Sequence, residues 1–146
     1  MQVREIMTDN PTCCAPDDTV QTAARAMADA DCGCLPVVDD MGSRHVVGVV
    51  TDRDLAIRAL ANGLGPETRV RDVMTADPAC CGPDADVREV ERIMADRQVR
   101  RVPVVDERSC CVGMVAQADL ARDEHDFDDR EVRKTIERIS APSRNS

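Results

Sequence analysis

Residues 3–16 read VREIMTDNPTCCAP, and residues 70–83 read VRDVMTADPACCGP. The similarity extends without a gap from 3–39 to 70–106, where 18 of the 37 paired positions carry the same residue. Self-similarity at a fixed offset is the sequence signature of a duplicated structural unit. The chain is therefore a tandem repeat, and the fold that one copy adopts is also expected of the other.

The repeat divides the 146-residue chain into a first domain at 1–63, a second domain at 68–123 and a C-terminal tail at 124–146. A unit of about 60 residues buries only about 60% of the surface of its unfolded chain, so we expect the two domains to pack together. The tail differs from the repeats. Its apolar residues at helical spacing predict a short amphipathic helix before a disordered end; they are Val132, Ile136 and Ile139.

Each domain is expected to form a short strand, a helix, two adjacent strands and a second helix. In the first domain a helix is predicted after Pro16, because acidic residues there precede apolar residues at helical spacing. Short β-branched runs at 35–38 and 46–50, separated by a turn-rich segment, predict two neighbouring strands. A second helix should begin near Asp52. Its expected inward-facing residues are Leu55, Ala59 and Leu60.

The composition disfavours several classes of function. The 28 acidic and 19 basic residues give a net charge of −9, which disfavours binding to a nucleic-acid duplex or an anionic membrane. A single Phe, with no Trp or Tyr, provides no aromatic platform for stacking single-stranded bases. No stretch approaches the roughly 18 apolar residues of a membrane span, and the N-terminus lacks the apolar core of a signal peptide. We therefore expect a cytoplasmic protein without nucleic-acid or membrane partners.

The motifs that recur in both halves resemble those of the cystathionine-β-synthase (CBS) domain. They include Val-Arg-Glu-Ile-Met-Thr, Cys-Cys-Ala-Pro-Asp, a helix containing Met27, Leu-Pro-Val-Val-Asp and Gly-Val-Val-Thr-Asp-Arg-Asp-Leu. The resemblance covers about residues 1–123, and the small format is similar to stand-alone bacterial CBS proteins of the hypoxic response protein type. It implies an α+β fold in which two CBS domains pack with pseudo-twofold symmetry as a Bateman module. It also implies ligand sensing in a cleft between the domains, without catalysis, and the ligands expected are AMP, ADP, ATP or S-adenosylmethionine.

The stretch Thr51-Asp52-Arg53-Asp54 is the sharpest candidate site. A hydroxyl at a strand-to-helix junction, backed by the free N–H groups of the helix start, suits a phosphate. A carboxylate three residues later can accept hydrogen bonds from ribose hydroxyls, and a nearby Arg can pair with phosphate. The resemblance implies these parts for Thr51 and Asp54. The alternative is that Thr51 or Asp52 merely caps the helix.

The second repeat departs from this pattern. Ala116 stands where the first repeat has Thr51, whereas Asp119 keeps the ribose-type carboxylate, so the two clefts should be unequal. Arg100 and Arg101 match family positions whose basic residues reach phosphates, which implies a one-sided positive contribution. The alternative is a solvated pair of surface charges.

The segments 12–15 and 79–82 match the family's edge strand, where backbone groups usually contact adenine, which makes Cys13, Cys14 and Ala15 candidate binding residues. The eight cysteines occur largely as vicinal pairs, and no CxxC spacing is present. Free Cys usually behaves as a small buried hydrophobe. A redox or metal-sensing role stays open, and no metal ligand set is predicted.

The leading function is a non-catalytic regulatory module that senses an adenosine-containing ligand and signals to an unidentified partner, without a required cofactor. An enzyme is disfavoured, because neither a catalytic triad nor a Gly-rich phosphate loop is found in the sequence. A cysteine-based redox or metal-responsive protein, or a CBS scaffold without a nucleotide, are the alternatives. A homodimer is expected, because the second helices carry more apolar residues than a small sheet can cover; these are Leu55, Ala59, Leu60, Leu120 and Ala121.

Overall fold

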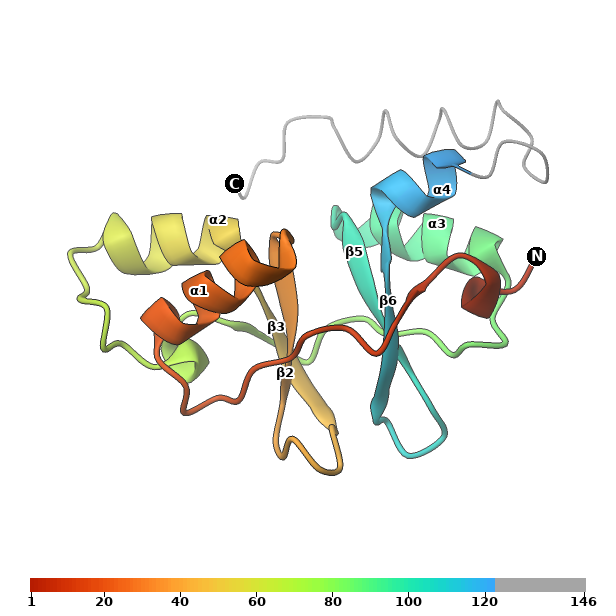
Figure 1. Ribbon diagram of the computed structural model, residues 1–146. Helices are drawn as coiled ribbons and strands as arrows, with labels where there is room; N and C mark the ends of the chain where they lie inside the picture. The colour runs from red at the N-terminus through yellow and green to blue at the C-terminus, as the bar shows by residue number, and fades with distance from the viewer. Residues whose placement is uncertain (123–146) are drawn as a thin grey trace. The chain divides into compact units, whose positions relative to one another are not determined.

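The computed structural model describes residues 1–122, with side chains up to Leu120, so the tail predicted at 124–146 lies outside the described residues. The chain divides into two compact units (Figure 1). Each combines helices with a three-stranded sheet, which confirms the expected α+β class. Unit 1 contains Met1–Asn10, Ala79–Glu107 and the described residues from Val112 to Arg122; unit 2 contains Pro11–Pro78 and Arg108–Cys111.

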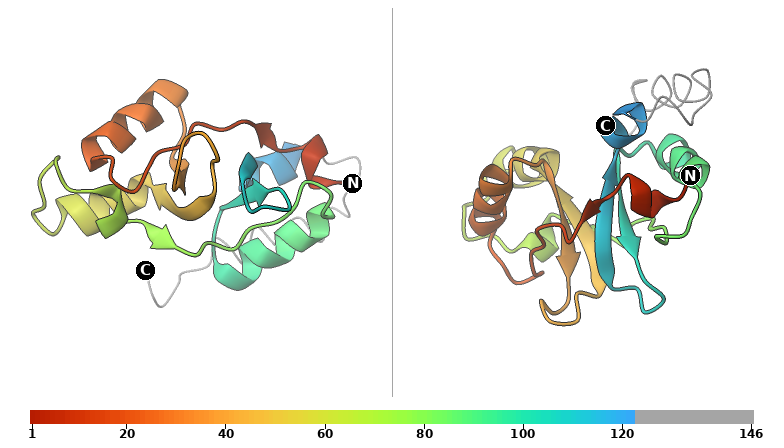
Figure 2. Two further views of the ribbon diagram at one scale, coloured as in Figure 1. Left: turned by 90° about the horizontal axis from the view of Figure 1, so that it is seen from below. Right: turned by 45° about the vertical axis from the view of Figure 1, so that its right-hand side comes forward.

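Unit 2 is built on an antiparallel sheet with the strand order β2-β3-β4. Its strands are β2 (Cys34–Val38), β3 (Val46–Thr51) and β4 (Thr75–Ala76). Its helical segments are α1 (Val20–Ala30), α2 (Asp52–Asp54), the π-helical η2 (Leu55–Leu60) and the 3₁₀ turn η3 (Val70–Asp72). Helix α1 packs against β2 and η2 (Figures 1 and 2). Because η2 follows α2 without a break, the two form one helix that starts where β3 ends.

Unit 1 repeats this plan around a sheet with the order β1-β6-β5. Its strands are β1 (Thr8–Asp9), β5 (Arg101–Val105) and β6 (Cys111–Ala116), of which the first residue of β6 is grouped with unit 2. Its helical segments are the 3₁₀ turn η1 (Val3–Glu5), α3 (Val87–Arg97) and α4 (Gln117–Arg122). Helix α3 packs against β5 and α4 (Figure 2). None of the helices among the described residues is both long enough and apolar enough to cross a membrane.

Each sheet is completed by a short edge strand from the other sequence repeat. In unit 1, Thr8 of β1 lies opposite Met114 of β6, and in unit 2, Thr75 of β4 lies opposite Val49 of β3. The compact units therefore differ from the repeats expected at 1–63 and 68–123. Sequence similarity follows the duplication, whereas compactness follows backbone pairing, which here joins the start of each repeat to the body of the other.

The 3₁₀ turns reinforce the same exchange. Val3 donates its N–H to the carbonyl of Ala85 at 2.9 Å, and Val70 donates to the carbonyl of Asp18 at 2.8 Å. Both valine side chains are 0% exposed and lie in the core of the unit that they join. The exposed ion pairs Arg4–Asp84 and Arg71–Asp17 lie beside these contacts. Since exposed pairs contribute about 0–1 kcal/mol, the buried valines supply the larger part of the attachment.

The two cores have matching compositions. They are aliphatic, as the near absence of aromatic residues requires. The fully buried members of unit 1 include Met94, Val102, Val104, Val115 and Leu120, and those of unit 2 include Ala23, Leu35, Val37, Val50 and Val73.

The first helix of each repeat begins at a side-chain cap. Thr19 accepts a hydrogen bond from the N–H of Thr22 at 3.1 Å, and Asp86 accepts one from Arg88 at 2.9 Å. Side-chain acceptors at this position satisfy N–H groups that have no partner within the helix. The cap residue Thr19 places the helix start at Val20, four residues after Pro16.

Three expectations about local structure are corrected. Ala59 is buried in the core of unit 2, but Leu60 is 76% exposed, because neighbouring residues on a helix project in different directions. Leu120 is 1% exposed and belongs to the core of unit 1, so it is not available for dimerisation. The expected strand at 12–15 shrinks to a single parallel bridge between Cys14 and Val37.

The edge strands approach so closely that a glycine is required opposite each of them. A Cβ added to Gly48 would lie 2.8 Å from both the Met74 sulfur and the Thr75 carbonyl oxygen. We expect Gly48→Ala to lower the free energy of unfolding by about 1–3 kcal/mol in urea titrations, because backbone has to move. Gly82→Ala is the matched control, because its Cβ would meet only the Val105 carbonyl at 4.0 Å and the first repeat already carries Ala15 there. Equal losses in both variants would contradict this account.

Candidate functional site

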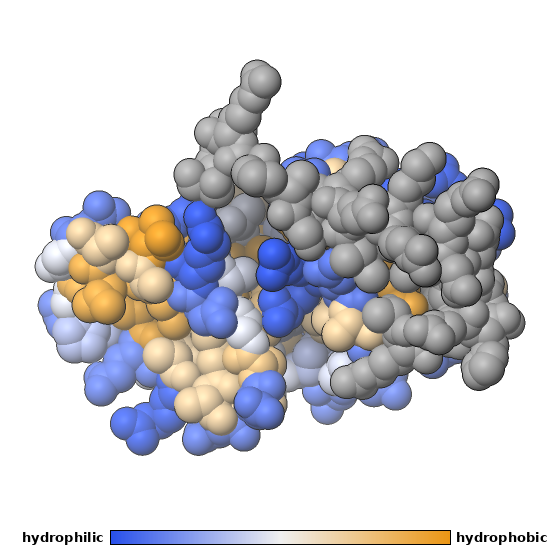
Figure 3. Space-filling view, turned by 90° about the horizontal axis from the view of Figure 1, so that it is seen from above, coloured by the Kyte–Doolittle hydropathy of each residue, from blue (hydrophilic) through white to orange (hydrophobic). Residues whose placement is uncertain are grey.

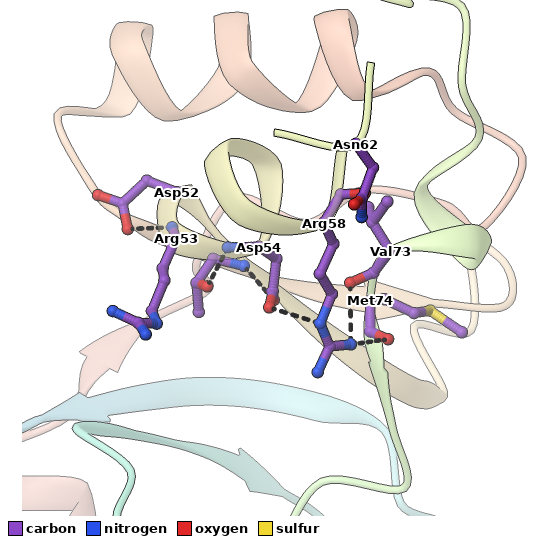
Figure 4. Close-up of polar contacts among 8 residues, drawn as sticks. Asp52, Arg53, Asp54, Arg58, Asn62, Val73 and Met74 are labelled. Atoms are coloured by element: carbon purple, nitrogen blue, oxygen red, sulfur yellow. Dashed lines mark hydrogen bonds and ion pairs between the residues drawn. The ribbon is translucent and has the colours of Figure 1, made fainter. Parts of the chain in front are cut away.

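The junction between β3 and α2 is closed by two reciprocal hydrogen bonds. The hydroxyl of Thr51 accepts from the N–H of Asp54 at 3.0 Å, and the Asp54 carboxylate accepts from the N–H of Thr51 at 3.0 Å (Figure 4). This is a capping box, so Thr51 does cap the helix. Its contact with a ligand stays a prediction. The cap does not exhaust either group, since the hydroxyl retains its proton and the carboxylate retains a second oxygen.

Arg58 fixes the second oxygen of Asp54. Its Nε lies 3.6 Å from Asp54 Oδ1, and its Nη1 donates to the carbonyls of Val73 and Met74, each at 3.3 Å. Figure 4 shows the guanidinium between the carboxylate and these two carbonyls. Only 13% of the Asp54 side chain is exposed, so its direction is set by the Thr51 N–H and Arg58 together.

Arg58 was not among the candidate site residues predicted from the sequence. The sequence does contain a signal for its pairing with Asp54, because an acidic residue four positions before an Arg on a helix predicts a side-chain pair. The Thr-Asp-Arg-Asp stretch offers Arg53 as a candidate cation closer in the sequence to Thr51.

Arg53 is placed differently from Arg58. It is exposed, and its backbone N–H donates to Asp52 Oδ1 at 2.8 Å. Figure 4 shows its side chain extending away from the carboxylate of Asp54. Its guanidinium is therefore directed toward solvent on the same edge of unit 2, and its predicted contact with phosphate stays a prediction.

The second repeat retains half of the capping box. Asp119 accepts from the N–H of Ala116 at 2.8 Å, which reproduces the bond from Asp54 to Thr51. Ala116 has no hydroxyl to return the contact. The two equivalent strand-to-helix junctions therefore differ in their local hydrogen bonding. The predicted inequality of the two clefts stays a prediction.

Arg100 and Arg101 lie in unit 1, next to the helix that contains Asp119. The carbonyl of Arg100 accepts from the N–H of Gln117 at 2.8 Å, and Arg101 begins β5. The equivalent contact in unit 2 joins Gly33 to the N–H of Asp52 at 2.9 Å. Within unit 1, the structure thus brings the two arginines to the junction that lacks a hydroxyl. Their predicted contribution beside Thr51 is not tested by the geometry of either unit alone.

The backbone of the segment expected to contact adenine is largely engaged in unit 2. Cys14 donates to the Pro36 carbonyl at 3.0 Å and accepts from Val38 at 2.8 Å. Ala15 donates to Asp18 Oδ2 at 2.8 Å. A contact between these groups and a base would therefore have to share or replace an existing hydrogen bond. The Cys13 side chain instead packs in a cluster with Val38 and Cys111.

The eight cysteines are all free thiols in the structure. Cys13, Cys14 and Cys81 are buried as predicted, whereas Cys80 is only half-buried. Burial, with smaller contributions from Asp18 and Cys34, raises the pKa of the Cys14 thiol to about 12. Burial raises the pKa of Cys81 to the same value. Within residues 1–122, no three or more His, Cys, Asp or Glu side chains gather in a group that could hold a metal ion.

The difference between the two junctions predicts opposite responses to two substitutions. Thr51→Ala removes a capping acceptor and should lower the free energy of unfolding by about 1 kcal/mol. Ala116→Thr supplies the missing acceptor and should raise it, by up to about 1 kcal/mol. Urea titrations of the two variants and the native protein measure both effects. A stabilised Thr51→Ala variant, or a destabilised Ala116→Thr variant, would contradict the assigned caps.

Comparison with known proteins places these features in a family. The model of the CBS domain matches residues 3–60 and 70–126. Hypoxic response protein 1 of Mycobacterium tuberculosis is 38% identical over 120 residues, which are 82% of each chain. A crystal structure of that protein, described as containing two coordinated zinc ions, superposes with a TM-score of 0.76 at 35% identity and covers 84% of this chain and 98% of the other.

Two similar structures contain adenosine compounds. The CBS pair of protein MJ0100, in complex with 5′-methylthioadenosine and S-adenosyl-L-methionine, has a TM-score of 0.75 at 27% identity, covering 84% of this chain and 94% of that chain. CBSX2 in complex with AMP has a TM-score of 0.70 at 26% identity, covering 83% and 93%. The duplicated motifs, the matched α+β units and these similarities lead to one conclusion: the chain belongs to the CBS domain family and contains two CBS domains.

Proposed function

We propose that this protein is a non-catalytic regulatory module that binds an adenosine-containing ligand at the Thr51–Asp54 junction of unit 2. The observation that carries the proposal is the fixed pair of hydroxyl and carboxylate at the end of β3, held by reciprocal bonds of 3.0 Å. The complexes of MJ0100 and CBSX2 support the class of ligand. AMP, ADP, ATP and S-adenosylmethionine are the candidates, and no cofactor is required.

Asp54 suits the ribose of such a ligand. Its Oδ1 and Oδ2 are oriented by Arg58 and by the Thr51 N–H, and a carboxylate oxygen has lone pairs for a further donor such as a ribose hydroxyl. A carboxylate already held in place loses little side-chain entropy when the ligand binds. Pre-orientation by Arg58 therefore favours recognition of a diol.

Thr51 suits a phosphate or another acceptor. Its oxygen accepts one hydrogen bond from the Asp54 N–H, and its O–H stays able to donate a hydrogen bond to a ligand oxygen. Exposed Arg53 lies two residues away on the same edge and supplies a positive charge.

We propose that Arg100 and Arg101 add phosphate contacts. Their effect can be tested by comparing adenosine with AMP, since only the phosphate should depend on them.

The proposed signal passes along the α2–η2 helix. This helix begins at the Thr51 cap and carries Ile57, which is 51% exposed, and Leu60, which is 76% exposed. Leu64, just beyond its end, is 43% exposed. Figure 3 shows an apolar area on this part of unit 2. We propose that this apolar patch, defined as Ile57, Leu60 and Leu64, contacts a second copy of the chain or a regulated protein.

A thermal-shift panel with AMP, ADP, ATP, NAD and S-adenosylmethionine tests ligand binding. A ligand present at about 100 times its Kd should add roughly 2.7 kcal/mol to the free energy of unfolding. A clear shift with at least one adenosine compound is the expected result. No shift across the panel would contradict the proposal and favour a scaffold without a nucleotide.

Calorimetry on Asp54→Asn and Asp119→Asn tests the site. Asparagine still accepts the hydrogen bond that holds each junction, so the fold is retained while the negative charge is lost. Charge-assisted hydrogen bonds contribute roughly 1.5–3 kcal/mol, so Asp54→Asn should weaken binding about ten- to a hundredfold. Asp119→Asn is the matched control and should have a much smaller effect. Equal losses, or a larger loss at Asp119, would place the ligand at the other junction.

Light scattering tests the homodimer. The native protein should give about twice the chain mass of 16.0 kDa. Leu60→Asp places a charge in the apolar patch and should convert the dimer to monomer, because a buried unpaired carboxylate opposes association. Met41→Asp is the control, because Met41 is 57% exposed in the turn between β2 and β3, away from this helix. A native monomer at high micromolar concentration would contradict the proposal.

A further inference from the structure

Cys13 and Cys111 meet in a small apolar cluster of unit 2. The cluster contains both cysteines and Val38, with the partly buried Val46 packed against it. Cys13 is 8% exposed and Cys111 is 6% exposed. The two residues are separated by almost the whole described chain, but both are grouped with unit 2 because residues 108–111 attach to that unit.

Arg44 holds the two cysteines together. Its Nη2 donates to the sulfur of Cys13 at 3.1 Å, and its carbonyl accepts from the N–H of Cys111 at 2.7 Å. Arg44 lies in the turn between β2 and β3 and has a φ of +61°, which is a left-handed conformation. Non-glycine residues seldom adopt this conformation, so the surrounding structure holds it in place.

The backbone around Arg44 is anchored to residues 108–111. Val46 donates to the carbonyl of Ser109 at 3.1 Å, and His45 forms an antiparallel bridge with Cys110. The His45 ring nitrogen Nδ1 lies 3.1 Å from the carbonyl oxygen of Arg108. These contacts keep Cys111 beside Cys13 through several hydrogen bonds that do not involve either sulfur.

The surroundings of Cys13 favour its thiolate. The Cys111 S–H donates to the Cys13 sulfur, and this bond together with the Arg44 guanidinium lowers the pKa of Cys13 to about 7, against the opposing effects of burial and of Cys14. The Pro11 carbonyl lies 3.4 Å from the Cys13 sulfur and also accepts from Arg44 Nη2 at 2.7 Å, so it helps to hold the guanidinium beside that sulfur. The same S–H bond raises the pKa of Cys111, which therefore stays protonated.

We propose that Cys13 and Cys111 form a redox-active thiol pair that a small hydroperoxide oxidises to a disulfide within the chain. The Cys13 thiolate attacks one oxygen of hydrogen peroxide and breaks the O–O bond. The products are a Cys13 sulfenic acid and hydroxide, which takes up a proton to become water. The Cys111 sulfur then attacks the sulfenic sulfur, loses its proton and displaces a second water. In total, two thiols and one peroxide give one disulfide and two waters.

Two alternatives fit the cluster less well. A metal ion is disfavoured, because the guanidinium of Arg44 already places a positive charge against Cys13, and residues 1–122 assemble no group of three or more candidate ligands. A purely structural role does not account for the bonds from Arg44 and Cys111, both of which stabilise the reactive ionised form. Cys14, the chain neighbour of Cys13, illustrates the inert case, since burial raises its pKa to about 12.

Peroxide treatment of the native protein, followed by blocking of the remaining thiols and peptide mass spectrometry, tests the pairing. Fragmentation has to separate Cys13 from Cys14 and Cys110 from Cys111, because each pair shares a peptide. We expect one cross-link, between Cys13 and Cys111, with the loss of two hydrogens. A cross-link involving other cysteines, or oxidation of exposed Cys32 with none at Cys13, would overturn the proposal.

Serine variants identify the two partners. Cys13→Ser and Cys111→Ser should each abolish the disulfide. Cys80→Ser, at the repeat counterpart of Cys13, and Cys110→Ser, at the chain neighbour of Cys111, should each leave it intact. Urea titrations verify that all four variants remain folded. A disulfide that persists in either of the first two variants, or disappears in both controls, would contradict the assignment.

Arg44→Gln tests the activation independently of either cysteine. The rate of oxidation in the native protein should rise with pH through about 7, where Cys13 ionises. Without the guanidinium the rise should move to higher pH, toward the usual thiol range. If the pKa returned fully to about 9, thiolate at pH 7 would fall about fiftyfold, offset by about eightfold greater nucleophilicity, which leaves a roughly five- to tenfold slower reaction. An unchanged pH profile in Arg44→Gln would show that Arg44 does not activate Cys13.

Discussion

The exchange of short edge segments between the repeats is the constraint on which both units depend. A pair of strands is marginally stable in water, and β1 or β4 supplies the third strand of each sheet. The 3₁₀ turn that precedes each edge strand adds a fully buried valine to the recipient core, Val3 in one unit and Val70 in the other. Because each unit is completed by the other repeat, neither repeat contains all the residues of its own core.

This exchange also explains why glycine occurs in the middle of β3 and of β6. Gly48 faces β4 and Met74, and Gly113 faces β1 and Met7, so both repeats use the same pairing of a glycine with a methionine. Methionine is flexible and fills irregular gaps, which suits a position where a main chain passes closely. The four residues are visible in the sequence as repeat equivalents, but their contact requires knowledge of which strand each edge segment joins.

The sequence was sufficient to predict the duplication, the order of helices and strands and the aliphatic cores, because these depend on local periodicity and on the repeat itself. It did not predict the membership of the compact units, since backbone pairing between distant segments carries no signature in side-chain pattern. At the candidate site, Thr51 and Asp54 were identified by residue type and spacing. The pairing of Arg58 with Asp54 was predictable from their spacing of four residues on a helix. The reciprocal capping bonds and the occupied backbone of Cys14 emerged only from the geometry.

The two repeats differ at their strand-to-helix junctions. The loss of a hydroxyl at Ala116 leaves one strand-to-helix junction with a carboxylate but with no side-chain donor at the cap, while the other retains both. The two equivalent junctions therefore differ in the side-chain groups that they present.

The thiol pair is also tied to unit 2. In the turn between β2 and β3, the Arg44 guanidinium reaches the Cys13 sulfur, and the Arg44 carbonyl accepts from the N–H of Cys111. The hydroxyl-carboxylate junction and the thiol pair both belong to unit 2 and share β3 as a scaffold: Thr51 lies at one end of that strand and Val46, which packs against the thiol pair, lies at the other. The two sites are therefore joined by a single hydrogen-bonded strand.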